Sequence, residues 1–75
     1  MMPIPRTETP QSSNIRWFEY DNGVLTVEFK NGRYEHYDVP EIDAQQLLQN
    51  HETGGSVGSH YHHYIKGKFE TKKVA

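Results

Sequence analysis

Hydrophobic and polar residues alternate most clearly in residues 24–30. Leu25, Val27 and Phe29 recur at every second position, with threonine, glutamate and lysine side chains between and after them. A strand with this period places its apolar side chains on one face of a sheet. The segment therefore predicts a strand that is buried on a single face.

The segments on either side also favour strands. Residues 15–20 are dense in β-branched and aromatic side chains, and an Asp-Asn-Gly turn signal follows at residues 21–23. Asn31-Gly32 is the strongest hairpin signal, because both residues tolerate the left-handed angles of a two-residue type I′ turn. A third strand is predicted over residues 33–39, so the three strands form an antiparallel meander.

The period of the third predicted strand is irregular. Tyr37 and Val39 share one face, whereas Tyr34 and His36 share the other. Rings on both faces leave two interpretations: a bulge shifts the register, or the second face is not simply exposed to solvent.

A helical pattern begins at Pro40, which suits a first helical position and is followed by Glu41 and Asp43, two carboxylates that complement the helix dipole. The helix should end before His51, ahead of the Thr-Gly-Gly at residues 53–55. Its apolar stripe, suited to packing on the sheet, comprises Ala44, Leu47 and Leu48, with Ile42 at one edge.

A second helix is predicted from a Ser56 cap through Lys66, with Gly67 as its terminator. Its apolar residues at helical spacing are Val57, Tyr61, Tyr64 and Ile65. Residues 68–75 form either a short strand or an extended basic tail.

The predicted fold is therefore α+β, with a three-stranded antiparallel β-meander followed by two helices packed on one face. Residues 1–13 hold three prolines and no apolar period, which predicts a disordered N-terminal tail. Residues 14–75 form a single domain, and with no cysteine its core must hold by packing alone. No apolar run approaches the roughly 20 residues of a membrane span, and the N-terminus lacks a signal-peptide layout, so we expect a soluble cytoplasmic protein.

Charge is distributed unevenly along the chain. Residues 33–54 carry one arginine against five carboxylates, whereas residues 55–75 carry four lysines against one glutamate. A basic end on an acidic body can steer a protein towards phosphates or an acidic partner. The alternative is a solvated tail, which the whole-chain pI of about 6.2 favours on charge alone.

The residues that most often carry metal binding or catalysis are not arranged for it. Of the five histidines, His60, His62 and His63 cluster on the second helix, but only His60 and His63 lie on neighbouring faces. Zinc needs three or four convergent ligands, so we expect no metal site and no cofactor. There is no cysteine, and no serine in a nucleophile-elbow or P-loop setting, so we expect no enzyme activity.

Aromatic and basic residues together indicate a binding surface. Rings on a sheet face can stack on bases while lysines hold phosphates, as in proteins that bind tRNA or single-stranded RNA. An alternative is that the rings belong to the core, and another is a protein-interaction module that docks through them onto a larger enzyme or a phage component. The candidate residues are Trp17, Tyr34, His36, Lys66, Lys68, Lys72 and Lys73.

The order of several short motifs between residues 12 and 74 resembles the KTSC domain family, named from the C-terminus of lysyl-tRNA synthetases and also found as small bacterial or phage proteins. The motifs are Ser-Ser-Asn-Ile at 12–15, Tyr-Asp at 20–21, Leu-Thr-Val-Glu-Phe at 25–29, Asn-Gly at 31–32, Tyr34 through Val-Pro at 39–40, Leu-Leu at 47–48, Ser-x-Gly at 56–58 and Ile-Lys-Gly-Lys-Phe at 65–69.

The central Tyr-x-Tyr motif of that family falls on Tyr34-Glu35-His36, where histidine replaces the second tyrosine. The resemblance implies no established activity. It implies RNA binding by association, through the attachment of the domain to a tRNA-charging enzyme.

Overall fold

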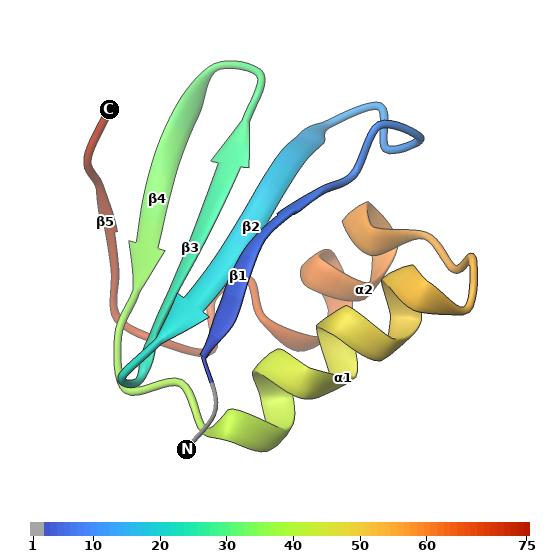
Figure 1. The fold of residues 1–75 in the computed structure, drawn as a ribbon. Coiled ribbons are helices and arrows are strands. Elements are labelled where there is room, and N and C mark those ends of the chain that lie inside the picture. Colours follow the sequence, from blue (N-terminus) through green and yellow to red (C-terminus); the bar gives the residue numbers. More distant parts are fainter. Residues whose placement is uncertain (1–2) are drawn as a thin grey trace.

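A five-stranded antiparallel sheet and two helices make up the part of the chain that the computed structural model describes, residues 3–75 (Figure 1). The strands lie in the sheet in chain order, so the sheet is a continuous meander. They are β1 (Ile4–Glu8), β2 (Ile15–Asp21), β3 (Val24–Phe29), β4 (Gly32–His36) and β5 (Thr71–Lys73). The helices, α1 (Glu41–Glu52) and α2 (Val57–Tyr64), cover one face of the sheet (Figure 1).

The predicted α+β class, with an antiparallel sheet and two helices, is confirmed, but the sheet has five strands instead of three. For residues 68–75 the sequence left a short strand and an extended basic tail as alternatives. The structure has the short strand, β5. The longest helix has 12 residues, and no helix within residues 3–75 is long and apolar enough to cross a membrane.

The sequence predicted a disordered tail over residues 1–13, but residues Ile4–Glu8 form the strand β1. β1 pairs with β2, and Ile4 is buried in the core. Of the three prolines only Pro5 lies within β1, and it is tolerated because β1 is an edge strand whose register shifts between Ile4 and Thr7. The first two residues of the predicted tail lie outside the described part of the chain.

The two central hairpins use different turn chemistry. Asn22 and Gly23 have φ angles of 52° and 83°, as a two-residue type I′ connection requires. In the second hairpin Phe29 pairs with Gly32, so the loop residues are Lys30 and Asn31, one position earlier than the Asn-Gly pair predicted.

Gly32 lies close to the C-terminal segment. A Cβ atom at this position would lie 2.8 Å from Cε of Lys73 and 3.2 Å from the carbonyl oxygen of Ala75. A side chain here would therefore move the flexible end of the lysine and press on the backbone at Ala75.

The two helices begin with different caps. Pro40 is the residue before α1, with extended angles of φ −61° and ψ 146°, so the first helical residue is Glu41. At α2 the predicted cap is confirmed: the backbone N–H of Ser59 donates to Oγ of Ser56 over 3.2 Å. The core lies between the helices and the sheet and includes Phe18, Tyr20, Leu25, Val27, Val39, Ala44, Leu47, Val57, Tyr61 and Ile65.

The irregular period of the third predicted strand has a backbone cause. Tyr34 and His36 face the helices, whereas Tyr37 faces the other way and donates its hydroxyl to Oε1 of Glu35 over 2.7 Å. Asp38 then adopts a φ of 56°, which reverses the alternation and returns Val39 to the core at 2% exposure. β4 itself ends at His36.

Candidate functional site

His36 lies in the core and not on an exposed stacking surface. Its side chain is 0% exposed, with Nδ1 3.0 Å from the carbonyl oxygen of Leu25 and Nε2 2.8 Å from the hydroxyl of Tyr61. A carbonyl oxygen only accepts, so Nδ1 carries the proton and Nε2 accepts from Tyr61. Burial lowers the pKa of His36, and the bond to Leu25 opposes this shift. His36 therefore joins the sheet to α2 and is unavailable to stack on a base.

A row of edge-to-face rings runs outward from this histidine. The ring of Tyr61 lies 5.4 Å from that of His36 and 5.1 Å from that of Phe29, and Phe29 in turn lies 5.6 Å from Tyr34. Burial raises the pKa of Tyr61. Edge-to-face contacts hold rings in defined orientations. Tyr34 is therefore a half-exposed ring whose orientation is held by its contact with Phe29.

Tyr34 lines a groove of about 580 Å³, which we call the aromatic groove. Among the described residues that line it, none is an aspartate or a glutamate. The lining comprises Asn14, Phe29, Asn31, Tyr34, Gly58, Tyr61, His62, Lys66, Gly67, Phe69 and Thr71.

Sequence reasoning assigned Phe29 and Tyr61 to the core and placed Phe69 beyond the second helix. Local periodicity marks the first two as buried, which they largely are. Only the antiparallel pairing of β3 with β4 and the placement of α2 bring these rings beside Tyr34. No pattern within a single segment indicates that grouping.

The four candidate lysines do not all lie on one surface. Lys66 lines the aromatic groove, and Lys73 pairs with Tyr34 across β4 and β5. Lys72 pairs with Glu35, whose side chain faces away from the helices, and Lys68 is exposed outside the groove lining. Of the predicted site residues, the structure brings together Tyr34, Lys66 and Lys73.

Trp17 lies on the sheet face opposite the helices and is nevertheless only 7% exposed. The guanidinium carbon of Arg6 lies 4.0 Å from its ring centroid and that of Arg33 lies 5.1 Å away. Arg33 is held by Glu28 at 2.9 Å, and Arg6 lies 4.0 Å from Glu19. The arginines, from strands on either side of β2, cover the ring, so Trp17 is neither exposed nor close to Tyr34.

We expect removal of either arginine to uncover Trp17. In Arg6→Ala or Arg33→Ala, water should reach the indole, shift its emission to longer wavelength and increase acrylamide quenching. Trp17 is the only tryptophan, so the signal is unambiguous. Loss of one cation–π contact should also cost about 0.5–1 kcal/mol of stability. Arg16→Ala, a neighbouring exposed arginine, is the matched control, and emission unchanged in both test variants would contradict the arrangement.

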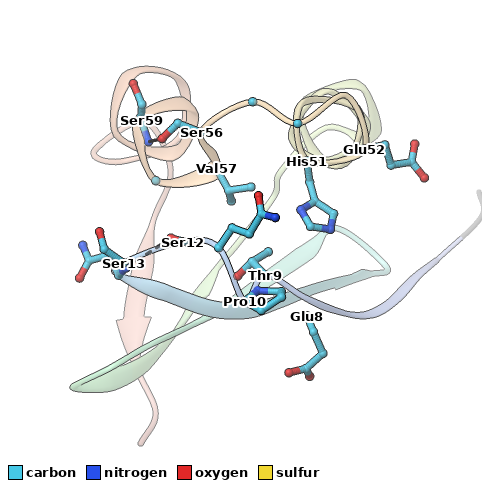
Figure 2. Close-up of a pocket in the computed structure, with 15 residues that line it drawn as sticks. Glu8, Thr9, Pro10, Ser12, Ser13, His51, Glu52, Ser56, Val57 and Ser59 are labelled. Carbon is cyan, nitrogen blue, oxygen red and sulfur yellow. Dashed lines mark hydrogen bonds between the residues drawn. The ribbon is translucent and has the colours of Figure 1, made fainter.

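A larger groove of about 990 Å³ lies between the β1–β2 connection and the α1–α2 loop (Figure 2). Its hydroxyls serve the local backbone: Thr9 donates to the carbonyl oxygen of Ile15 over 2.6 Å, and Oγ of Ser12 accepts from the N–H of Ile15 over 3.0 Å. Glu8 and Glu52 are among its lining residues, and Figure 2 shows their side chains on its outer sides. These carboxylates make it less suited to an anionic ligand than the aromatic groove is.

The clustered histidines of α2 have contacts within their own helix. His60 packs against Tyr64 with ring centroids 4.7 Å apart, and Nδ1 of His63 lies 2.9 Å from the carbonyl oxygen of Ser59. Burial lowers the pKa of His60, and Asp43 opposes this shift. Within residues 3–75, no three histidine, cysteine, aspartate or glutamate side chains are grouped to hold a metal ion.

Comparison with known proteins identifies relatives of this architecture. The chain is 33% identical over 69 residues to lysine–tRNA ligases of Nostoc punctiforme and Trichormus variabilis, a match that covers 88% of this chain and 12% of each ligase. The crystal structure of a KTSC domain protein from Yersinia pestis superposes with a TM-score of 0.75 at 30% identity, covering 99% of this chain and all of the other.

The chain thus spans about one eighth of the length of the ligases that it matches. The family model for the KTSC domain matches residues 11–69, which include β2, β3, β4 and both helices. This chain therefore belongs to the KTSC domain family.

Proposed function

We propose that this domain is a non-catalytic binding module whose ligand is RNA. One observation carries the proposal: Tyr34 and Lys66 line the aromatic groove, whose lining holds no carboxylate among the described residues, and Lys73 pairs with Tyr34 on the neighbouring strand. An aromatic ring beside ammonium groups suits bases joined by phosphates. Because the chain as a whole has a net charge of −2, the absence of carboxylates is a local property of this surface.

The relatives support tRNA as the first RNA to test. The matched region belongs, in two organisms, to an enzyme named lysine–tRNA ligase. A module attached to such an enzyme contributes most simply by holding its RNA, and a free-standing copy can bind RNA by the same surface. The proposed location is the cytoplasm, where tRNA is used.

The non-catalytic role rests on the types of residue present. The chain has no cysteine, and its serines have neither a nucleophile-elbow nor a P-loop setting. Ser12 and Ser56 instead accept hydrogen bonds from backbone N–H groups, one in a loop and one at a helix start. These bonds give both hydroxyls a structural role.

We expect the domain to bind tRNA or single-stranded RNA with an affinity that falls as salt rises. Each phosphate contact to a single strand contributes a slope of about −0.7 in log K against log salt. Lys66→Ala combined with Lys73→Ala should therefore make the slope shallower by about 1.4. Fluorescence anisotropy with labelled RNA over a salt series measures both quantities.

Two controls accompany this titration. Lys68→Ala combined with Lys72→Ala removes the same charge from two lysines that neither line the aromatic groove nor pair with Tyr34, so it should change the slope less. Thermal unfolding of every variant checks that the fold is retained. A domain that binds no RNA even at low salt would rule out the proposal.

A second candidate function is protein interaction. Ile42 and Tyr64, on α1 and α2, are each 59% exposed, more than is usual for large apolar side chains. Exposed apolar residues of this kind suit a protein partner such as a larger enzyme or a phage component. Absence of RNA binding at low salt would favour this candidate over the first.

A further inference from the structure

We infer that the aromatic groove takes one unpaired nucleotide of an RNA strand, with its base against Tyr34 and its phosphates beside Lys66 and Lys73. The inference rests on the proposed function and adds to it the location and the class of ligand. It predicts a preference for single-stranded over duplex RNA, because a paired base is enclosed within a helix and cannot enter a groove.

The rings of the groove are arranged before any ligand binds. Tyr61 is 9% exposed and held by His36, Phe29 is half-buried against Tyr61, and Tyr34 packs edge-to-face on Phe29. A ring at the end of a fixed row loses little conformational freedom when a base packs on it. The volume of about 580 Å³ lies within the roughly 300–1,000 Å³ usual for small-ligand sites.

Polar groups at the groove suit the edges of a base. Asn14, Asn31 and Thr71 line it from the β1–β2 connection, the β3–β4 turn and β5. An amide both donates and accepts hydrogen bonds, which matches the mixed donors and acceptors of a nucleobase edge. Lys66 supplies a positive charge in the same lining.

The opposite sheet face is less suited to the same ligand. Trp17 is covered there by Arg6 and Arg33, and these arginines lie beside Glu19 and Glu28. A strand stacked on that ring would have to displace the arginines and approach carboxylates. Since Trp17 and Tyr34 lie on opposite faces, one base cannot contact both.

The test measures binding of a fluorescein-labelled short oligouridylate by anisotropy. Tyr34→Ala should bind it roughly 5- to 150-fold more weakly, the range for loss of one base–aromatic stack. Tyr34→Phe should bind nearly as well as the wild type. Tyr34→Leu keeps apolar volume without an aromatic ring, so it tests stacking if the alanine variant unfolds. Tyr64→Ala, an exposed tyrosine outside the groove, is the matched control.

Two further readouts locate the ligand. A duplex of the oligouridylate with oligoadenylate should bind more weakly than the single strand. Emission from Trp17, on the far face, should stay unchanged as RNA is added.

Each contrary result has a distinct meaning. If Tyr34→Ala and Tyr34→Leu bind like the wild type while loss of Lys66 and Lys73 weakens binding, the groove assignment is overturned and RNA binding stands. Equal affinity for duplex, or quenching of Trp17, also overturns the groove assignment. If uridine monophosphate binds as tightly as the oligonucleotide, the inference that the ligand is part of an RNA strand is overturned. Absence of any RNA binding overturns both proposals.

Discussion

Replacement of Phe18 by alanine is expected to destabilise the domain by about 3–5 kcal/mol. Phe18 is 0% exposed at the centre of β2, where it pairs with Val27 and meets the ring of His51 edge-to-face at 6.3 Å. Its removal loses apolar burial and leaves a cavity between sheet and helix, which surrounding residues fill only partly. Small domains sit near the lower end of the usual 5–15 kcal/mol, so this loss takes most of the stability.

Urea unfolding followed by circular dichroism measures the effect. The urea concentration at the unfolding midpoint should fall sharply. The dependence of the unfolding free energy on urea concentration should stay unchanged, because a changed dependence would indicate a changed denatured state. Phe18→Leu retains apolar volume and should lose less, giving a measurable value if the alanine variant does not fold. Tyr64→Ala, on the exposed side of α2, should change stability by less than about 0.5 kcal/mol. A loss below 1 kcal/mol in Phe18→Ala would contradict the observed packing.

The stability of the wild-type domain is expected to fall as pH drops below about 6.5, the usual pKa of histidine. Burial lowers the pKa of His36 in the folded state. Above pH 6.5 the ring is neutral in both states, so the native contacts keep their full value. Below pH 6.5 the His36 ring binds a proton in the unfolded chain, whereas burial keeps the same ring neutral in the folded state. One such proton costs up to about 1.4 kcal/mol per pH unit until the folded pKa is reached.

His36→Gln removes this titration. The variant should be less stable than the wild type at pH 7.5, because the bonds to the Leu25 carbonyl and the Tyr61 hydroxyl are lost or weakened, at about 1–3 kcal/mol for each group left unpaired. Its stability should vary less between pH 7.5 and 5.5. Urea unfolding at several pH values measures both effects.

His60 requires a control, since burial lowers its pKa in the same direction. His60→Gln should remove a smaller share of the pH dependence, because His60 is only partly buried whereas His36 is fully buried. A pH profile as steep in His36→Gln as in the wild type would show that other groups control acid stability.

His36 connects stability to the proposed binding surface. Its bond to Tyr61 supports the row of rings that ends at Tyr34, so His36 acts as a positioning residue for the aromatic groove. His36 therefore supports the ring of Tyr61 from within the core and does not itself lie at the surface.

Local sequence was sufficient for the central elements. The alternation of Leu25, Val27 and Phe29 indicated β3, the Asn-Gly turn at residues 22–23 indicated the first hairpin, and Ser56 indicated the start of α2. The cap and the turn depend on contacts between residues close in sequence, and the two-residue period of β3 is visible directly in the order of its residues. Such contacts leave a readable pattern in a single segment.

Other features depend on partners distant in sequence. β1 forms because it pairs with β2, a contact that the proline-rich local sequence does not indicate. The Tyr34 and Lys66 sides of the aromatic groove come together only after α2 has packed on the sheet. From the sequence, the rings and the lysines were equal candidates for a binding surface. The sequence did not show that Tyr34, Lys66 and Lys73 lie at or beside the aromatic groove, whereas Trp17, Lys68 and Lys72 do not.

Sequence patterns were therefore enough to predict the α+β class, the KTSC family and the residue types available for the proposed binding surface. The folded structure was needed to show that His36 faces Tyr61 in the core, that Trp17 lies under two arginines on the far face, and that Tyr34 borders a groove. The physical reason is that alternation divides a strand into two faces without marking which one the helices will cover. That choice is made when helices and sheet bury their apolar surfaces together.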